Sequence, residues 1–127
     1  MRIFTWLLMT MGELHRSTDK AQLDSKANTI RTMLGVLENK LGEGPYFDGA
    51  NFSFVDIWFG PVVPYFDIYQ QHTALDFLDG TPKLQSYFKR LAARESVANA
   101  IPPDAQAYLL KVMKDRDSEF SKLISAR

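Results

Sequence analysis

One long segment carries apolar residues at alternating steps of three and four, and this spacing restricts it to a helix. The residues of this stripe are Ala27, Ile30, Leu34, Leu37 and Leu41. Such steps place side chains on one face of an α-helix, and Gly42, directly after the stripe, is a typical stop. No segment alternates apolar and polar residues for long enough to predict a strand. The chain is therefore expected to be all-α.

A first helix is expected before this stripe, in "MRIFTWLLMTMGELHR", and it is apolar almost all the way round. A short signal peptide is an alternative, but Trp6, Thr10 and the lack of an A-x-A-like cleavage site argue against it. The run is also too short to span a bilayer. A helix of this kind is buried on several sides, so it needs a partner beyond its own bundle. The polar connection after it offers Asp24 or Ser25 as the next N-cap.

A capping signal precedes the central helix, in "GPYFDGANFSFVDIWFG". Ser53 can accept from the amide three residues on, and Asp56 can reach back to the amide of Ser53. Phe52 can pack on Ile57 as a hydrophobic staple. These residues predict where a helix begins and carry no catalytic chemistry.

Prolines divide the second half of the chain. Pro61 and Pro64 should bend or shorten the central helix, since proline cannot donate a ladder hydrogen bond. Thr81 and Pro82 predict the cap and first position of another helix, and a last long helix is expected from Asp104. The length of 127 residues fits one domain, 1–127, built as a bundle of five to six helices.

The composition excludes several kinds of function. Lys and Arg number 15, and so do Asp and Glu, which leaves no global field to attract nucleic acid or an anionic membrane. Without cysteine, the chain can supply no disulfide, thiolate metal site or thiol nucleophile. His15 and His72 are too far apart for a helical pair of metal ligands. No metal, no bound cofactor and no catalytic residue are expected, and the cytoplasm is the default location.

Two ordered blocks carry a family resemblance, "LENKLGEGPYFDGANFSFVDIWFGPVVPYFD" and "TPKLQSYFKRLAARESVANAI". They resemble the C-terminal helical domain of cytosolic glutathione transferases, which shows Leu-Glu, Gly-Pro-Tyr-Phe, a glycine turn and a Ser-x-x-Asp box in this order. Asp56, Pro61 and the following "YFD" look most like bacterial members near the omega and beta classes. Glu95 departs from the pattern, since the family favours proline there.

The resemblance implies that two domains have different roles. A thioredoxin-like domain, absent from these residues, would hold the glutathione cosubstrate and the group that activates it. This chain would supply the wall of a pocket for a hydrophobic electrophile, together with dimer contacts, and would be inactive alone. Residues 1–16 would contact the second subunit or the thioredoxin-like domain.

The same resemblance suggests site residues. "TWLLMTMGELHR" is similar to beta-class segments whose polar members reach toward glutathione, which makes Glu13 and Arg16 candidates to support that site. Leu8 stands where those segments carry Asn. Helical spacing and family position predict a pocket wall formed by Leu8, Met11, Gly12, His15 and Tyr65.

Two alternatives stay open from the residues. The methionines and leucines of this segment are more typical of plain core than of substrate contact. His15 is also consistent with an exposed or capping histidine near a helix end. The whole chain is also compatible with a stand-alone interaction module that binds a protein through residues 1–11. An unrelated helical bundle is the third reading.

Overall fold

The computed structural model describes residues 2–42, 46–47 and 51–125, and this part of the chain is all helical, as predicted. Its helices are α1 (Arg2–His15), α2 (Lys20–Lys40), α3 (Phe54–Phe59), the 3-10 turn η1 (Gly60–Val62), α4 (Val63–His72), α5 (Pro82–Ala93), α6 (Glu95–Ala100), α7 (Ala105–Asp115) and α8 (Glu119–Ser125). The count exceeds five to six because the bent and short segments are separate helices.

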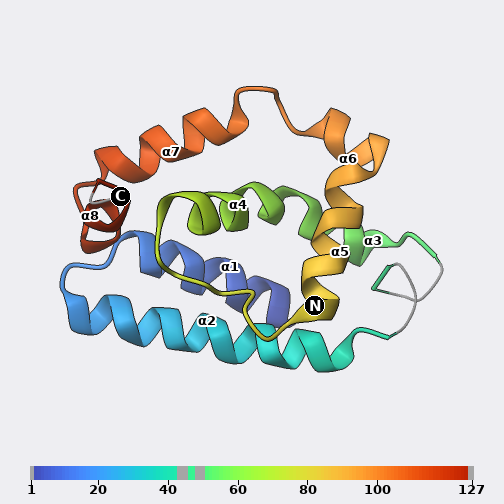
Figure 1. Cartoon of the computed structure of the whole chain (residues 1–127), viewed down its shortest axis with the longest axis horizontal. Helices are drawn as coiled ribbons and strands as arrows, with labels where there is room; N and C mark the ends of the chain where they lie inside the picture. Colours follow the sequence, from blue (N-terminus) through green and yellow to red (C-terminus); the bar gives the residue numbers. More distant parts are fainter. Residues whose placement is uncertain (1, 43–45, 48–50, 126–127) are drawn as a thin grey trace.

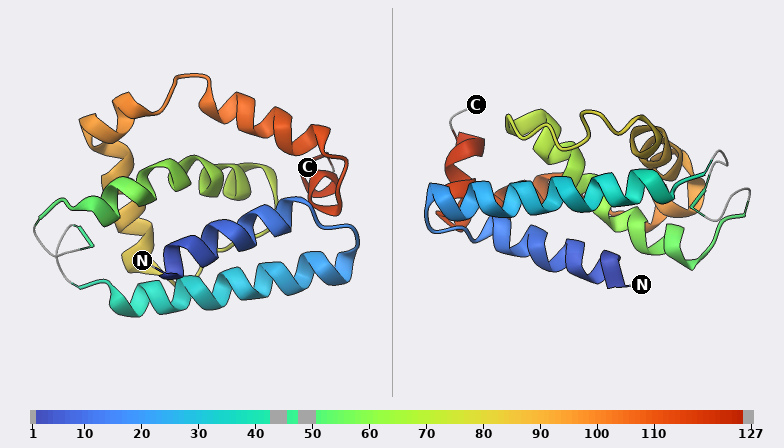
Figure 2. Two further views of the ribbon diagram at one scale, coloured as in Figure 1. Left: turned by 180° about the vertical axis from the view of Figure 1, so that it is seen from behind. Right: turned by 90° about the horizontal axis from the view of Figure 1, so that it is seen from below.

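The helices form one bundle around α4 (Figure 1). α1 packs along α2, α7 packs beside α4, and α8 contacts α1 and α2 at the end where those two helices are joined. α5 crosses the opposite end of the bundle and leads into α6 (Figure 2). Among the described helices, none combines the length and apolar character needed to cross a membrane.

The start of α2 differs from the prediction. Asp19 is the N-cap, and its carboxylate accepts from the amide of Gln22 at 2.8 Å. Asp24 and Ser25, the predicted caps, lie inside α2 on its exposed side, so that prediction was wrong. The local sequence offered several capping side chains, and the helix begins directly after Asp19. The apolar stripe is buried as predicted, from Ala27 through Leu41.

The prolines of the central segment act as expected. Pro61 falls in η1 and Pro64 in the first turn of α4, so the segment is a helix broken by a 3-10 turn. Beyond the break, Ile68 and Tyr69 are fully enclosed by the core. The break changes the direction of the segment between α3 and α4 (Figure 1).

The Ser53–Asp56 capping box is present at the start of α3. Asp56 is fully buried, and one of its oxygens accepts from the amide of Ser53 at 2.8 Å. Its other oxygen accepts from the amide of Phe47 at 3.0 Å and from the hydroxyl of Tyr87 at 2.6 Å. Burial and this hydrogen bond to Asp56 raise the pKa of Tyr87. The box therefore also ties α3 to the preceding loop and to α5.

The N-terminus of α5 is capped from another helix. Thr81 precedes Pro82 as predicted, but its hydroxyl donates to the carbonyl of Leu78 rather than accepting from the helix. The carboxylate of Glu38 in α2 accepts from the amides of Lys83 at 2.7 Å and Leu84 at 3.1 Å. Glu38, 45 positions before Lys83, thus caps the N-terminus of α5.

Replacing Glu38 by alanine is expected to lower the free energy of unfolding by about 1 to 2 kcal/mol, because two amides lose an acceptor near a helix N-terminus. Urea denaturation followed by circular dichroism measures this loss. Glu38→Gln keeps one oxygen acceptor and should recover part of it. An alanine variant as stable as the wild type would show that water replaces the carboxylate without cost.

α1 buries one face and exposes the other. Leu7, Met11 and Leu14 lie in the core. Trp6 and Met9 are 54% and 60% exposed. The prediction was burial on several sides, but within this chain only one face of α1 is covered. Phe4 stacks on Trp58 of α3 at a centroid distance of 6.0 Å. This contact joins the exposed apolar side chains of α1 to those of α3, which are Phe54, Ile57 and Trp58.

Candidate functional site

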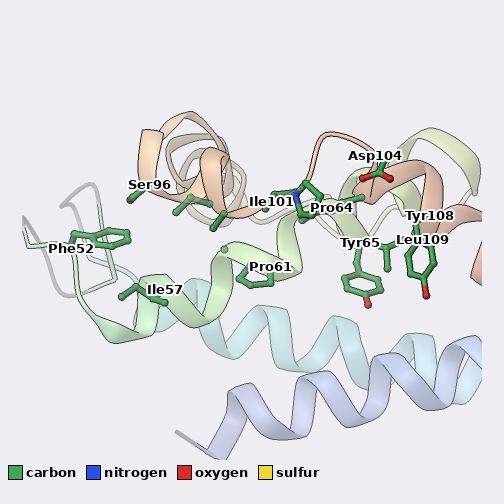
Figure 3. A pocket seen from close by; sticks show the side chains of 15 residues that line it. Phe52, Ile57, Pro61, Pro64, Tyr65, Ser96, Ile101, Asp104, Tyr108 and Leu109 are labelled. Carbon is green, nitrogen blue, oxygen red and sulfur yellow. The ribbon is translucent and has the colours of Figure 1, made fainter.

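A cavity of about 760 Å³ lies between the proline-bent α3–α4 segment and the α6–α7 segment (Figure 3). Its wall is mostly apolar. The residues from the α3–α4 side are Phe52, Ile57, Gly60, Pro61, Pro64 and Tyr65, and those from the α6–α7 side are Ser96, Val97, Ala100, Ile101, Pro102, Asp104, Ala105, Tyr108 and Leu109. A volume of this size and an apolar lining are typical of a site for a small organic ligand.

Local sequence explains how the two sides meet and separate. A Cβ atom on Gly60 would lie 3.1 Å from Cγ1 of Val97, so glycine allows α6 to approach η1 closely. Beyond this contact α6 ends, and the pair Pro102 and Pro103 interrupts the helix before α7 begins. Gly60 and Val97 both line the cavity, so this close contact is part of its wall.

Phe52 closes the cavity near α6 and is itself held in place. The guanidinium of Arg94 lies 3.7 Å from the centroid of the Phe52 ring, in a cation–π arrangement. The same guanidinium donates to the hydroxyl of Tyr46 at 3.0 Å. Phe52 was predicted to pack on Ile57 as a staple; the two side chains share this cavity wall.

Polar groups are few in this wall. They are the phenols of Tyr65 and Tyr108, the hydroxyl of Ser96 and the carboxyl of Asp104. Figure 3 shows the two phenol oxygens pointing in the same direction, toward α1, at the end of the cavity away from Phe52. The end near Phe52 carries the Ser96 hydroxyl, and the opposite end carries the two phenols and the Asp104 carboxyl.

His15 lies behind Tyr65 and is buried, with 7% of its surface exposed. Its ring is nearly parallel to that of Tyr65, at 15° and 5.8 Å between centroids. Nε2 lies 2.6 Å from the hydroxyl of Tyr69. Burial, and then the positive charges of Arg116 and Arg16, lower the pKa of His15 to about 4. The imidazole is therefore neutral at pH 7, and in the tautomer with its proton on Nδ1 its Nε2 accepts a hydrogen bond from the Tyr69 hydroxyl.

Of the five residues predicted for the pocket wall, Tyr65 lines this cavity. His15 contacts Tyr65 from the core side, and Met11 belongs to the core with 2% exposure. Leu8 is 41% exposed on the outer face of α1. Helical spacing had grouped Leu8 with Met11 and His15, but the core covers only part of that face.

The remaining predicted residues stand at the C-terminal end of α1, away from the cavity wall. Glu13 forms an ion pair with Lys26 of α2 at 2.6 Å. The guanidinium of Arg16 folds back toward Gly12, where a Cβ would lie 3.1 Å from its nearest nitrogen. Glycine at position 12 therefore makes room for the Arg16 side chain.

The α6–α7 half of the cavity was not predicted as a site. Val97 and Tyr108 lie about 32 and 43 residues from Tyr65 in sequence, and no short motif connects them. Ala105 and Leu109 lie four positions apart on α7, and both residues line the cavity. The described residues contain no cluster of three or more His, Asp or Glu side chains that could hold a metal ion.

Comparison with known proteins identifies the family. The family model of the glutathione S-transferase C-terminal domain matches residues 20–90, which cover most of α2 through α5. The chain belongs to this family. The capping box at Ser53 and the helix starting at Pro82, on which the resemblance rested, both fall inside the match.

Several curated glutathione S-transferases are similar to the chain. Glutathione S-transferase U21 of Arabidopsis thaliana is 32% identical over 109 residues, which are 84% of this chain and 49% of that protein. Glutathione S-transferase U19 of the same plant is 36% identical over 70 residues, 55% of this chain and 32% of that protein. A probable glutathione S-transferase, parC, of Nicotiana tabacum is 34% identical over 84 residues, 65% and 38% of the two chains.

The matches leave one expectation without support and limit another. These relatives are plant proteins, and they give no support to the predicted likeness to bacterial omega- and beta-class members. The chain spans about half or less of the length of the curated relatives it matches. It is therefore a C-terminal domain of the glutathione S-transferase family, comparable to part of each relative.

Proposed function

We propose that this domain forms the hydrophobic electrophile-binding wall of a glutathione S-transferase that conjugates glutathione or transfers thiols. The single observation that carries the proposal is the apolar cavity of about 760 Å³ in a member of this family. The ligand class is a hydrophobic small molecule with an electrophilic centre. Tyr65 and Tyr108 would orient its polar end by hydrogen bonding.

We assign glutathione and the group that activates its thiol to a second domain. The glutathione thiolate attacks the electrophilic carbon, a carbon–sulfur bond forms, and a leaving group departs with its electron pair or the nucleophile adds to a double bond. This chain supplies no residue that would activate the thiol, so we expect it to be inactive alone. Its own contribution is to bind the electrophile in an apolar wall and exclude water.

A thioredoxin-like domain or a second subunit is the proposed partner, through residues 1–16. The exposed apolar side chains Trp6, Leu8 and Met9 on α1 support this proposal, since such groups are usually covered when they cluster. The relatives are about twice as long as the matched part of this chain or longer, which allows for a further domain. Cytoplasmic location and any finer subclass, including the bacterial omega- or beta-like one, stay predictions.

The cavity is tested with 1-anilinonaphthalene-8-sulfonate, an apolar fluorescent dye. Ala105 lines the cavity, and Ala107, two positions along α7, is exposed outside it. Ala105→Trp fills the cavity and should weaken dye binding by about tenfold or more, whereas Ala107→Trp should leave it within about twofold. The dissociation constant is measured by fluorescence titration.

A stand-alone interaction module is the second candidate, and the exposure of Trp6 and Met9 on α1 favours it. The same titration separates the two functions. Dye binding that is insensitive to Ala105→Trp but lost on Trp6→Ser would place the apolar surface of interest on α1. That result would contradict the electrophile pocket and favour the module.

A further inference from the structure

Tyr65 is the one predicted site residue that reaches the cavity, and its other side rests on His15. We propose that His15 is a positioning residue: its ring fixes the orientation of Tyr65 in the cavity wall and thereby sets the affinity for the ligand. The proposal rests on the proposed function, because it takes the cavity as the ligand site. It adds a buried residue on α1 that controls that site without touching the ligand.

Three aromatic side chains surround the imidazole. One face stacks on Tyr65, Nε2 meets the hydroxyl of Tyr69, and the ring of Phe120 lies 4.9 Å away between centroids. The backbone is fixed as well, since the hydroxyl of Ser118 donates to the carbonyl of His15 at 2.6 Å. α1, α4 and the start of α8 therefore meet at this residue.

This arrangement requires a neutral ring. The titratable groups that face His15 are Tyr65 and Tyr69 from α4, Arg16 from the turn directly after α1, and Arg116 from the turn before α8. Both arginine charges disfavour the imidazolium, and burial disfavours it further. Burial also raises the pKa of Tyr69, so its hydroxyl keeps the proton that it donates to Nε2. The charges around the ring therefore preserve the bond that fixes its plane.

His15 makes a ring contact and a hydrogen bond. The ring contact alone involves a residue that lines the cavity. The stacked ring contacts Tyr65, whereas the Nε2 acceptor serves Tyr69 in the core. His15→Phe keeps a flat ring and loses the acceptor, and His15→Gln keeps an acceptor and loses the ring. If His15 positions Tyr65, the variant that keeps the ring, His15→Phe, should keep its affinity for the ligand. If His15 is only structural, the less stable variant should have the lower affinity.

The experiment measures dye affinity and conformational stability for the wild type, both variants and the control His72→Gln. His72 ends α4 and is outside both the cavity wall and the His15 contacts. We expect His15→Gln to weaken dye binding by about 3- to 10-fold, and His15→Phe and His72→Gln to stay within about twofold. His15→Phe should nevertheless be the less stable of the two His15 variants, because it leaves the buried Tyr69 hydroxyl unpaired.

A second measurement needs no ligand. The tyrosine ring resonances of isotopically labelled protein, assigned with Tyr65→Phe, should show Tyr65 displaced in His15→Gln and unchanged in His15→Phe. Equal losses of affinity in the two variants, or an unmoved Tyr65 signal in His15→Gln, would overturn the proposal. If the wild type fails to bind the dye, the proposed function fails, and the Tyr65 resonances still decide whether His15 positions Tyr65.

Discussion

Asp56→Ala is expected to lower the free energy of unfolding by about 3 to 4 kcal/mol, because it removes a helix cap and leaves buried donors unpaired. The carboxyl group of Asp56 is fully buried and accepts from the amides of Ser53 and Phe47 and from the hydroxyl of Tyr87. Losing an N-cap costs about 1 kcal/mol, and each buried donor left without an acceptor costs about 1 to 3 kcal/mol. Urea denaturation followed by circular dichroism measures the loss.

Two further substitutions make this expectation specific. Tyr87→Phe removes one of the donors and should cost about 1 to 2 kcal/mol. Asp24→Ala removes an exposed carboxylate of α2 and should change stability by less than about 0.5 kcal/mol. A loss below about 1 kcal/mol for Asp56→Ala would mean that water or a shift of the loop satisfies the donors.

Acidification from pH 7.5 to pH 4.5 is expected to cost about 2.5 kcal/mol of stability through His15 alone. The unfolded chain takes up a proton near pH 6.5, whereas the folded chain resists it until about pH 4. Below pH 6.5 the unfolded state therefore binds more protons, and stability falls as pH falls. The contribution of His15 is complete above pH 6.5 and is lost progressively down to about pH 4.

The test compares the pH dependence of the wild type and of His15→Gln, each unfolded by urea at a series of pH values. The variant is expected to be less stable at pH 7.5 but to lose about 2.5 kcal/mol less on acidification. His72→Gln serves as the matched control and should follow the wild type. Parallel pH curves for the wild type and His15→Gln would show that the buried imidazole does not contribute to acid unfolding.

Local sequence was sufficient for most of the helices. The stripe from Ala27 to Leu41 predicted α2 because the spacing of apolar residues fixes which face can be buried. Ser53 and Pro82 predicted two helix starts because capping and proline geometry act within a few residues. The family followed from the order of the same signals, and the family match confirms it.

The candidate site was predicted only in part. Tyr65 was named from its position in the family, and the structure adds Tyr108 and Val97 on the opposite wall. Met11 is buried in the core and Leu8 is exposed. Helical spacing places both on one face of α1, so it could not show which part of that face the other helices cover. The burial of His15 depends on α4 and α8, neither of which adjoins it in sequence.

By itself, the sequence determined most of the helices and the capping box of α3, because these depend on residues a few positions apart. The order of the same signals along the chain indicated the family. The tertiary structure decided which distant polar groups pair. Glu38 caps α5, Tyr87 donates to Asp56, and the Tyr69 hydroxyl bonds to His15, across 45, 31 and 54 positions of sequence. Packing brings these groups together, and where it also removes them from water, as at Asp56 and His15, it makes the hydrogen bond necessary.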